Sequence, residues 1–181
     1  ISGFPPEIEP DGIPNSISTP LSTTQFNITY HLGLAHYLKG DFARAQEAYI
    51  GCLKFCNNDD LLVACVDWMY MNYRRQGRDI DAKSILDSVL DSMNIIENDS
   101  YYKRCRMYQG KISPDSLLSV GPDRKDADLV MATQGYGVGN WYLCNGDSVK
   151  AKGVFEKVVA GKNFSAFGFI AAEADLARWE K

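Results

Sequence analysis

The sequence lacks several features that mark whole classes of protein. No apolar run approaches the roughly 18 to 20 residues that a helix needs to cross a bilayer, so we expect no membrane insertion. There is no excess of basic residues, because 19 Lys and Arg stand against 23 Asp and Glu, a net charge of −4. Nucleic-acid binders usually carry excess positive charge, so we expect no nucleic-acid partner.

Sequence motifs for catalysis and metal binding are also missing. The chain contains no G-x-S-x-G, no H-E-x-x-H and no Walker loop. Its two histidines, His31 and His36, are five residues apart and fall on different sides of a helix, whereas a helical metal pair prefers a spacing of four. The acidic residues around Asp59 and Asp126 do not have EF-hand spacing. We therefore predict no enzyme, no metal site and no cofactor.

Cysteine is present, but no C-x-x-C pair occurs among the five thiols. Cys52 and Cys56 are four residues apart and share one helical face. We interpret them as small apolar residues of a core, with a reactive or oxidised pair as the alternative. Thiols spread through helices slightly favour a reducing compartment such as the cytoplasm, without identifying the location.

The remaining composition is that of one globular domain, with 181 residues, 45% hydrophobic and 23% charged. Proline is concentrated at one end, since five of the seven prolines fall within the first twenty residues. Proline fixes φ and removes a backbone donor, so we predict that residues 1–23 form an extended, non-helical arm. This arm is a candidate for folding back into a groove of the helical domain or for self-association with a second copy.

Helical periodicity dominates the sequence after the arm. Apolar residues recur at spacings of three and four over residues 30–38, 80–93 and 154–159, and no strand alternation competes. Glycine followed closely by aspartate separates these segments, at Gly40-Asp41, Gly77-Arg78-Asp79 and Gly146-Asp147. Glycine permits the left-handed stop of one helix and aspartate caps the next, so the pattern predicts an all-α chain of antiparallel helix hairpins.

One stretch, HLGLAHYLKGDFARAQEAYIGCLKF, closely resembles a tetratricopeptide repeat (TPR). Gly33 and Ala45 occupy the two small positions at which the helices of such a repeat cross, where a larger side chain would push the helices apart. The side chains expected to fill the space around this crossing are Leu32, Tyr37 and Phe42. Small residues recur at comparable positions, and we expect them to be structural: Ala82, Gly139 and Ala151.

The resemblance implies a right-handed α-solenoid of about four repeats over residues 24–181. The repeats are expected at residues 26–59, 60–97, 98–123 and 124–163, the third being degenerate, with a terminal helix within 164–181. In the third unit, Ser113 and Pro114 have the sequence of a helix N-cap and first helical residue. The apolar face expected on the terminal helix consists of Phe167, Ile170, Ala171, Ala174 and Ala177.

In TPR proteins the first helix of each repeat lines a concave groove. Tyrosine and arginine are favoured in binding sites of this kind, because both combine apolar area with hydrogen-bonding tips. Interior packing is the alternative for Tyr37 and Tyr136. The residues that the resemblance places in a peptide-binding groove are Asn27, Tyr30, Leu34, Tyr37, Asp67, Met71, Arg74, Tyr102, Arg106, Tyr136 and Asn140.

The resemblance therefore predicts a non-enzymatic scaffold that binds a protein or peptide in this groove. The first alternative is a structural helical-repeat region of a larger enzyme or assembly, and a third interpretation is an enzyme that acts through Asp67 with Arg74. The glycine-rich stretch from Gly135 to Asn140 invites comparison with phosphate-binding loops. Because it falls inside an expected helix, we interpret its glycines as close helix packing.

Overall fold

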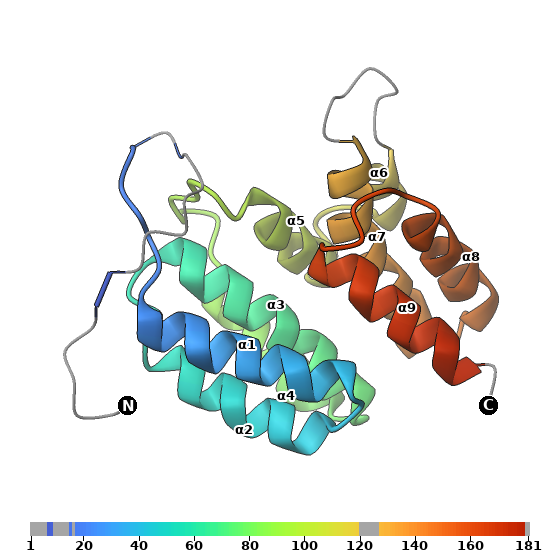
Figure 1. Ribbon diagram of the computed structural model, residues 1–181, viewed down its shortest axis with the longest axis horizontal. Helices are drawn as coiled ribbons and strands as arrows, with labels where there is room; N and C mark the ends of the chain where they lie inside the picture. Colours follow the sequence, from blue (N-terminus) through green and yellow to red (C-terminus); the bar gives the residue numbers. More distant parts are fainter. Residues whose placement is uncertain (1–6, 9–14, 16, 120–126, 180–181) are drawn as a thin grey trace. The chain divides into compact units, whose positions relative to one another are not determined.

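Helices form the regular structure of the described part of the chain, which comprises residues 7–8, 15, 17–119 and 127–179 of the computed structural model (Figure 1). Within these residues the only strand-like pairing is an isolated bridge between Ile8 and Thr23. The predicted all-α class is confirmed. The chain divides into two compact units, Ile1–Cys105 and Arg106–Lys181.

The helices occur in the following order along the chain. Those of the first unit are α1 (Thr24–Leu38), α2 (Phe42–Leu53), α3 (Asp59–Arg75), α4 (Asp79–Ile85) and the 3₁₀ turn η1 (Leu86–Ser88). Helix α5 (Asp99–Tyr108) begins in the first unit and ends in the second. The second unit continues with α6 (Pro114–Leu118), α7 (Ala127–Cys144), α8 (Ser148–Val159) and α9 (Phe167–Trp179).

Two of the three predicted glycine–aspartate turns have the expected chemistry. Gly40 and Gly146 adopt positive φ angles of 76° and 85°, in the left-handed region that favours glycine. The side chain of Asp41 accepts a hydrogen bond from the backbone N–H of Arg44 at the start of α2. Asp147 caps α8 in the same way, so the predicted helix stops and starts are confirmed at both turns.

The third predicted turn begins at Gly77, which has a positive φ of 69°. The N-cap of α4 is Arg78, which makes no side-chain capping bond, so the predicted aspartate cap is wrong there.

The described part of the arm lies against the start of α1. The backbone N–H of Thr24 donates to the carbonyl of Glu7 at 2.9 Å, and the N–H of Glu7 donates to Gln25 Oε1 at 3.1 Å. Thr23 then caps α1, because its side chain accepts from the N–H of Phe26. The first helix consequently begins immediately after the predicted arm.

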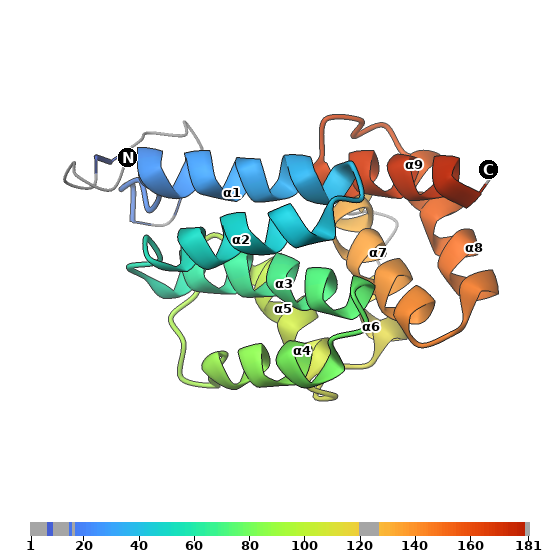
Figure 2. The same ribbon diagram turned by 90° about the horizontal axis from the view of Figure 1, so that it is seen from below.

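In the first unit α1 packs on α2, α2 on α3 and α3 on α4 (Figures 1 and 2). A methyl group added at Gly33 would lie 2.7 Å from the ring of Tyr49, so the absence of a side chain lets the two helices approach. Ala45 is fully buried. Leu32 departs from the expectation: it is 49% exposed, because Tyr49 rather than Leu32 fills the space beside Gly33.

Helix α4 is shorter than the apolar pattern over residues 80–93 indicated. It ends at Ile85, and η1 closes the turn at Ser88. Ala82 and Leu86 are buried, whereas Ile80 is 86% and Leu90 is 55% exposed. The pattern has a lysine at position 83, and the chain leaves the helix at Val89, which is buried but has an extended backbone with φ −96° and ψ 105°.

A buried carboxylate joins α3 to the loop before α5. Asp60 is 1% exposed, and its Oδ1 accepts hydrogen bonds from the backbone N–H groups of Glu97 and Asn98 at 2.8 and 2.7 Å. The N–H of Ile96 also donates to Asp60, at 3.0 Å to Oδ2. The cap of α3 is Asn58, which accepts from the N–H of Leu61. Asp60 is thus a tertiary anchor for the loop in addition to its place in the first turn of α3.

We expect Asp60→Ala to lower the free energy of unfolding by about 1 to 3 kcal/mol, because the loop N–H groups lose their acceptor while they remain partly buried. Asp60→Asn keeps one acceptor oxygen and should cost less. Urea denaturation of the two variants and the parent measures the difference. Equal stability of Asp60→Ala and the parent would show that water replaces the carboxylate at no cost.

In the second unit α7 packs against α6, α8 and α9. A methyl group added at Gly139 would lie 2.4 Å from the ring of Phe155, and one at Gly135 would lie 2.6 Å from Val158. Ala151 is fully buried. The glycine-rich stretch is therefore helical, and Gly135 and Gly139 permit close packing against α8.

The terminal helix buries a face different from the expected one. Its buried residues are Gly168, Ala171, Ala172 and Asp175, whereas Ala177 is exposed. Asp175 accepts a hydrogen bond from the Tyr136 hydroxyl at 3.1 Å, and Arg178 pairs with the same carboxylate at 2.6 Å. The face of α9 that contacts α7 carries small residues such as Gly168 and Ala172. The buried face is therefore displaced by about one residue from the face predicted from apolar character, and that prediction is wrong.

Candidate functional site

Most of the predicted groove residues of the first unit are buried. Tyr37 is 1% exposed, and its ring packs edge-on against Trp68 at a centroid distance of 5.2 Å. Tyr30 stacks on Phe26 at 5.3 Å. The buried members of this set are Tyr30, Leu34, Tyr37, Asp67 and Met71. Their contacts place Tyr30 and Tyr37 in the packing of the unit, the alternative that the sequence left open for Tyr37.

The other groove candidates of this unit are half-buried and engaged with their own surroundings. The guanidinium of Arg74 donates from Nη1 to the Tyr70 hydroxyl at 2.9 Å. Its Nε lies 2.8 Å from the carboxylate of Asp79. The remaining two bind locally: Asn27 donates to the Ser22 hydroxyl at 3.1 Å, and the Tyr102 hydroxyl donates to the carbonyl of Leu90 at 3.2 Å.

The groove candidates of the second unit are buried as well. Tyr136 and Asn140 have no exposed surface, and Arg106 is 7% exposed. The hydroxyl of Tyr136 donates to Asp175 on α9. Arg106 Nη1 donates to Gln109 Oε1 at 2.8 Å. Tyr136 therefore has a defined structural role in joining α7 to α9.

Asp67 is part of a buried ion pair with Arg104. The side chains are 0% and 1% exposed, and Arg104 Nε donates to Asp67 Oδ1 at 2.9 Å while its Nη2 binds Oδ2. Arg104 also lies over the ring of Tyr101, with 4.8 Å from its central carbon to the ring centroid. Asp67 is thus paired with Arg104, whereas the enzymatic interpretation combined Asp67 with Arg74.

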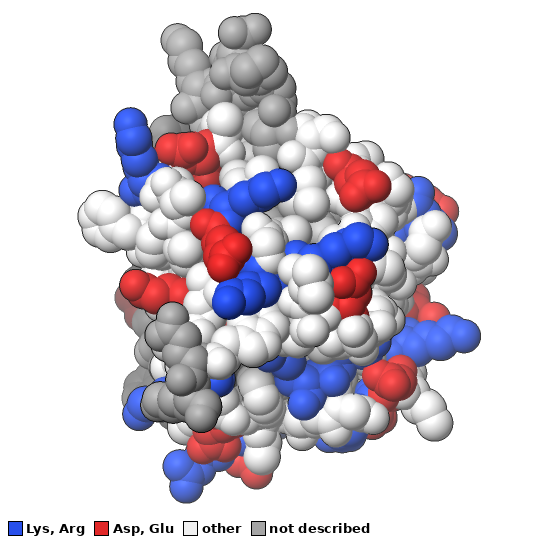
Figure 3. Space-filling view, turned by 90° about the vertical axis from the view of Figure 1, so that its right-hand side faces the viewer, with Lys and Arg blue, Asp and Glu red and all other residues white. Residues whose placement is uncertain are grey.

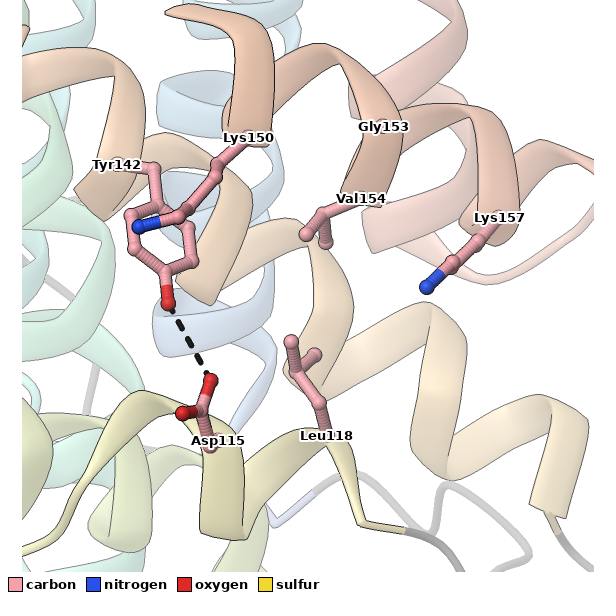
Figure 4. Close-up of a pocket in the computed structure, with 7 residues that line it drawn as sticks. All are labelled: Asp115, Leu118, Tyr142, Lys150, Gly153, Val154 and Lys157. Atoms are coloured by element: carbon pink, nitrogen blue, oxygen red, sulfur yellow. Dashed lines mark hydrogen bonds between the residues drawn. The ribbon is translucent and has the colours of Figure 1, made fainter. Parts of the chain in front are cut away.

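A pocket of about 320 Å³ opens between α6, α7 and α8 in the second unit (Figure 4). Leu118 and Val154 form its apolar part, and the amino groups of Lys150 and Lys157 lie at its edges (Figure 4). The full lining comprises Asp115, Leu118, Tyr142, Lys150, Gly153, Val154 and Lys157. It combines apolar surface with cations and hydrogen-bonding groups, the composition of a small recognition site.

The polar side of the pocket is held by local interactions. The Tyr142 hydroxyl donates to Asp115 Oδ1 at 3.4 Å, and partial burial together with the Asp115 charge raises the pKa of Tyr142. Lys150 lies 5.2 Å from the Tyr142 ring centroid and 3.1 Å from Asp147. The hydrogen bond to Asp147 raises the pKa of Lys150, so its amino group is cationic at neutral pH.

The face of the molecule drawn in Figure 3 carries charges of both signs. On the face drawn in Figure 3, basic and acidic side chains are interspersed among uncharged ones. None of the described helices combines the length and apolar character that a bilayer crossing needs.

The sequence matches no protein-family model, no curated protein and no solved structure. The resemblance to tetratricopeptide repeats consequently rests on the residues of this chain and on the helix hairpins that they form.

Sequence reasoning did not identify this pocket, because the resemblance directed attention to the first helix of each repeat. Four of its lining residues come from α8, the second helix of a hairpin. A signal was present: Lys150, Val154 and Lys157 recur at spacings of four and three, so they share one helical face. This pair of cations flanking an apolar residue is the sequence feature that could have directed a search to this face.

Proposed function

We propose that this chain is a non-enzymatic scaffold whose helix hairpins stack as a right-handed solenoid of the tetratricopeptide kind and bind a protein or peptide segment. Two features support the proposal. The hairpin α1–α2 has small residues, Gly33 and Ala45, at the positions where a tetratricopeptide repeat has them. The hairpin α7–α8 repeats the arrangement with Gly139 and Ala151.

The pocket between α6, α7 and α8 carries the proposal for the binding surface. The Lys150 side chain is 64% exposed, and the amino groups of Lys150 and Lys157 can both reach a bound anion. In the described part of the chain, no carboxylate forms an ion pair with Lys157. The side chains of Leu118 and Val154 offer apolar contact between the two amino groups. This chemistry suits a peptide segment that presents an acidic residue next to an apolar one.

The size of the pocket agrees with such a partner. Ligand pockets typically span about 300 to 1,000 Å³, and the pocket here, at about 320 Å³, lies at the small end of that range. One or two side chains fill this volume, whereas a large cofactor exceeds it. The Asp115 carboxylate and the Tyr142 hydroxyl are placed to bind backbone N–H and C=O groups of an extended segment.

A peptide library displayed on phage tests the proposal with a matched set of variants. We expect the parent to enrich peptides with an acidic residue adjacent to an apolar one. Lys150→Glu combined with Lys157→Glu should weaken binding of a selected peptide at least about tenfold, because both cations become repulsive. Lys152→Glu, a charge reversal at an exposed residue of α8 outside the pocket, should bind like the parent.

Two results would contradict the proposal. One is the absence of any enriched sequence class. The other is equal binding by the double reversal and by Lys152→Glu, which would locate the peptide elsewhere.

Binding of the selected peptide should also weaken as salt is raised, since exposed charges are screened beyond about 10 Å at 0.1 M.

A second candidate function is a structural helical-repeat region of a larger enzyme or assembly. The observation in its favour is the burial of most predicted groove residues, which leaves those side chains unavailable to a free ligand. This candidate predicts no peptide enrichment in the same experiment. It also predicts that the chain co-purifies in constant stoichiometry with a larger complex. Self-association through the arm stays a prediction of the sequence.

A further inference from the structure

Three cysteine sulfurs come together at one end of the α2–α3 hairpin. The Sγ atoms of Cys52, Cys56 and Cys65 lie within 4.8 Å of one another. Cys52 and Cys65 are fully buried, whereas Cys56 is half-buried. All three thiols are free. The other two cysteines of the described chain, Cys105 and Cys144, do not belong to this group.

The local backbone explains why these residues meet. Cys52 lies in the last turn of α2, Cys56 in the connection to α3, and Cys65 two turns into α3. The connection is short and α2 packs on α3, so the three sulfurs converge although Cys65 is 13 positions from Cys52. The spacing of Cys52 and Cys56 predicted that these two thiols share one helical face. The connection between α2 and α3 brings Cys65 to them as the third thiol.

Each thiol already has an acceptor in the folded chain. Their S–H groups lie 3.6 to 3.8 Å from backbone carbonyls of Phe26 for Cys52, Leu61 for Cys56 and Tyr49 for Cys65. These weak contacts position the sulfurs without any bound ion. The folded protein can therefore present the cluster as a preformed site, and the half-buried Cys56 gives an ion access from the solvent.

We propose that Cys52, Cys56 and Cys65 form a trigonal three-thiolate site for a soft, thiophilic metal ion, with Cu(I) as the best match. With a metal–sulfur distance of about 2.3 Å, three sulfurs around a central ion lie about 4.0 Å apart, so a small movement of the side chains closes the site. Thiolate ligands select soft ions such as Cu(I). Binding replaces three S–H bonds with three metal–sulfur bonds and releases up to three protons.

The number of ligands separates Cu(I) from Zn²⁺. Structural zinc sites are tetrahedral and take four protein ligands. No histidine or carboxylate of the described chain joins the three sulfurs. Three sulfurs suffice for Cu(I), whereas Zn²⁺ needs a fourth ligand from water in a site where two of the sulfurs are buried. We therefore expect Cu(I) to bind in preference to Zn²⁺.

The proposal is tested by anaerobic titration of the reduced, full chain with Cu(I) in the presence of a chromophoric Cu(I) chelator. We expect one ion per chain, an ultraviolet thiolate-to-metal band and the protection of three thiols from alkylation. Cys56→Ser should lower the affinity more than about 100-fold, because the loss of outer-shell partners alone costs 10- to 100-fold. Cys144→Ser, at a half-buried thiol outside the cluster, should bind like the parent.

The opposite results are equally clear. The proposal is wrong if Cys56→Ser and Cys144→Ser bind Cu(I) equally, or if the parent does not compete with the chelator. Tighter binding of Zn²⁺ than of Cu(I) would overturn the choice of ion. Circular dichroism of Cys56→Ser establishes that its fold is retained, and Cys56→Ala provides a second variant if serine disturbs the turn. Neither result depends on peptide binding in the second unit.

Discussion

Replacing Asp67 with alanine is expected to lower the free energy of unfolding by about 3 to 5 kcal/mol, one of the largest effects of a single substitution in this chain. The substitution removes the carboxylate that binds the buried guanidinium of Arg104 through two of its nitrogens. Arg104 is 1% exposed and binds both oxygens of Asp67 through Nε and Nη2. A buried charge that loses its partner cannot recover its hydration while the fold persists, so its desolvation cost is no longer offset.

Two comparison variants separate the buried pair from ordinary surface charge. Lys103, next to Arg104 on α5, pairs with Asp99 at 2.6 Å while both side chains are largely exposed. Lys103→Ala should therefore cost less than about 1 kcal/mol. The double substitution Asp67→Leu with Arg104→Met removes both charges and should recover most of the loss, because apolar replacements of buried pairs are often neutral.

Urea denaturation at neutral pH, followed by far-ultraviolet circular dichroism, measures all three free energies. An Asp67→Ala variant that is as stable as Lys103→Ala would mean that water reaches the pair and solvates Arg104. A double variant that is no better than Asp67→Ala would assign the loss to packing and not to charge.

Gly168→Ala is expected to destabilise the second unit by about 3 kcal/mol or more, at or above the upper end of typical overpacking costs. A Cβ atom at this position would lie 2.1 Å from the carbonyl oxygen of Ala132 and 3.2 Å from Cβ of Tyr136. The first obstacle is backbone and cannot rotate away. Relief requires α9 to move off α7, which also breaks the hydrogen bond between Tyr136 and Asp175.

Gly153→Ala is the matched control, since Gly153 is a helical glycine of the same unit. No atom lies within 4 Å of a Cβ added there. Alanine is favoured over glycine in a helix interior, so this variant should be more stable by about 0.5 to 1 kcal/mol. Thermal melts of both variants give the sign of each effect. Similar melts for Gly168→Ala and the parent would contradict the close contact between α7 and α9.

Local features of the fold could be predicted because their causes are local. Ser113 caps α6, with its side chain accepting from the N–H of Ser116 and Pro114 at the first helical position. The glycine–aspartate turns that begin at Gly40 and Gly146 have the same origin. In each case a few adjacent residues satisfy the helix-end donors or permit a positive φ, and neither requires knowledge of distant contacts.

Features that depend on distant residues could not be predicted in the same way. Asp67 and Arg104 are 37 positions apart, and no periodicity relates them. The buried face of α9 follows from the approach of Gly168 to Ala132, which favours small size over apolar character. The groove assignment followed a family pattern, but aromatic side chains such as Tyr37 serve equally well as core.

The amino-acid sequence by itself determined the all-helical class, the helix ends at the turns that begin at Gly40 and Gly146, and the small residues at two helix crossings, because periodicity and capping act over one or two turns. Only the tertiary structure decided which charges pair, which face of a helix is buried and which side chains line the pocket beside α8. It also brought the third thiol to Cys52 and Cys56. These outcomes depend on how segments that are distant in the sequence pack against one another. The local pattern of a single sequence does not specify that packing.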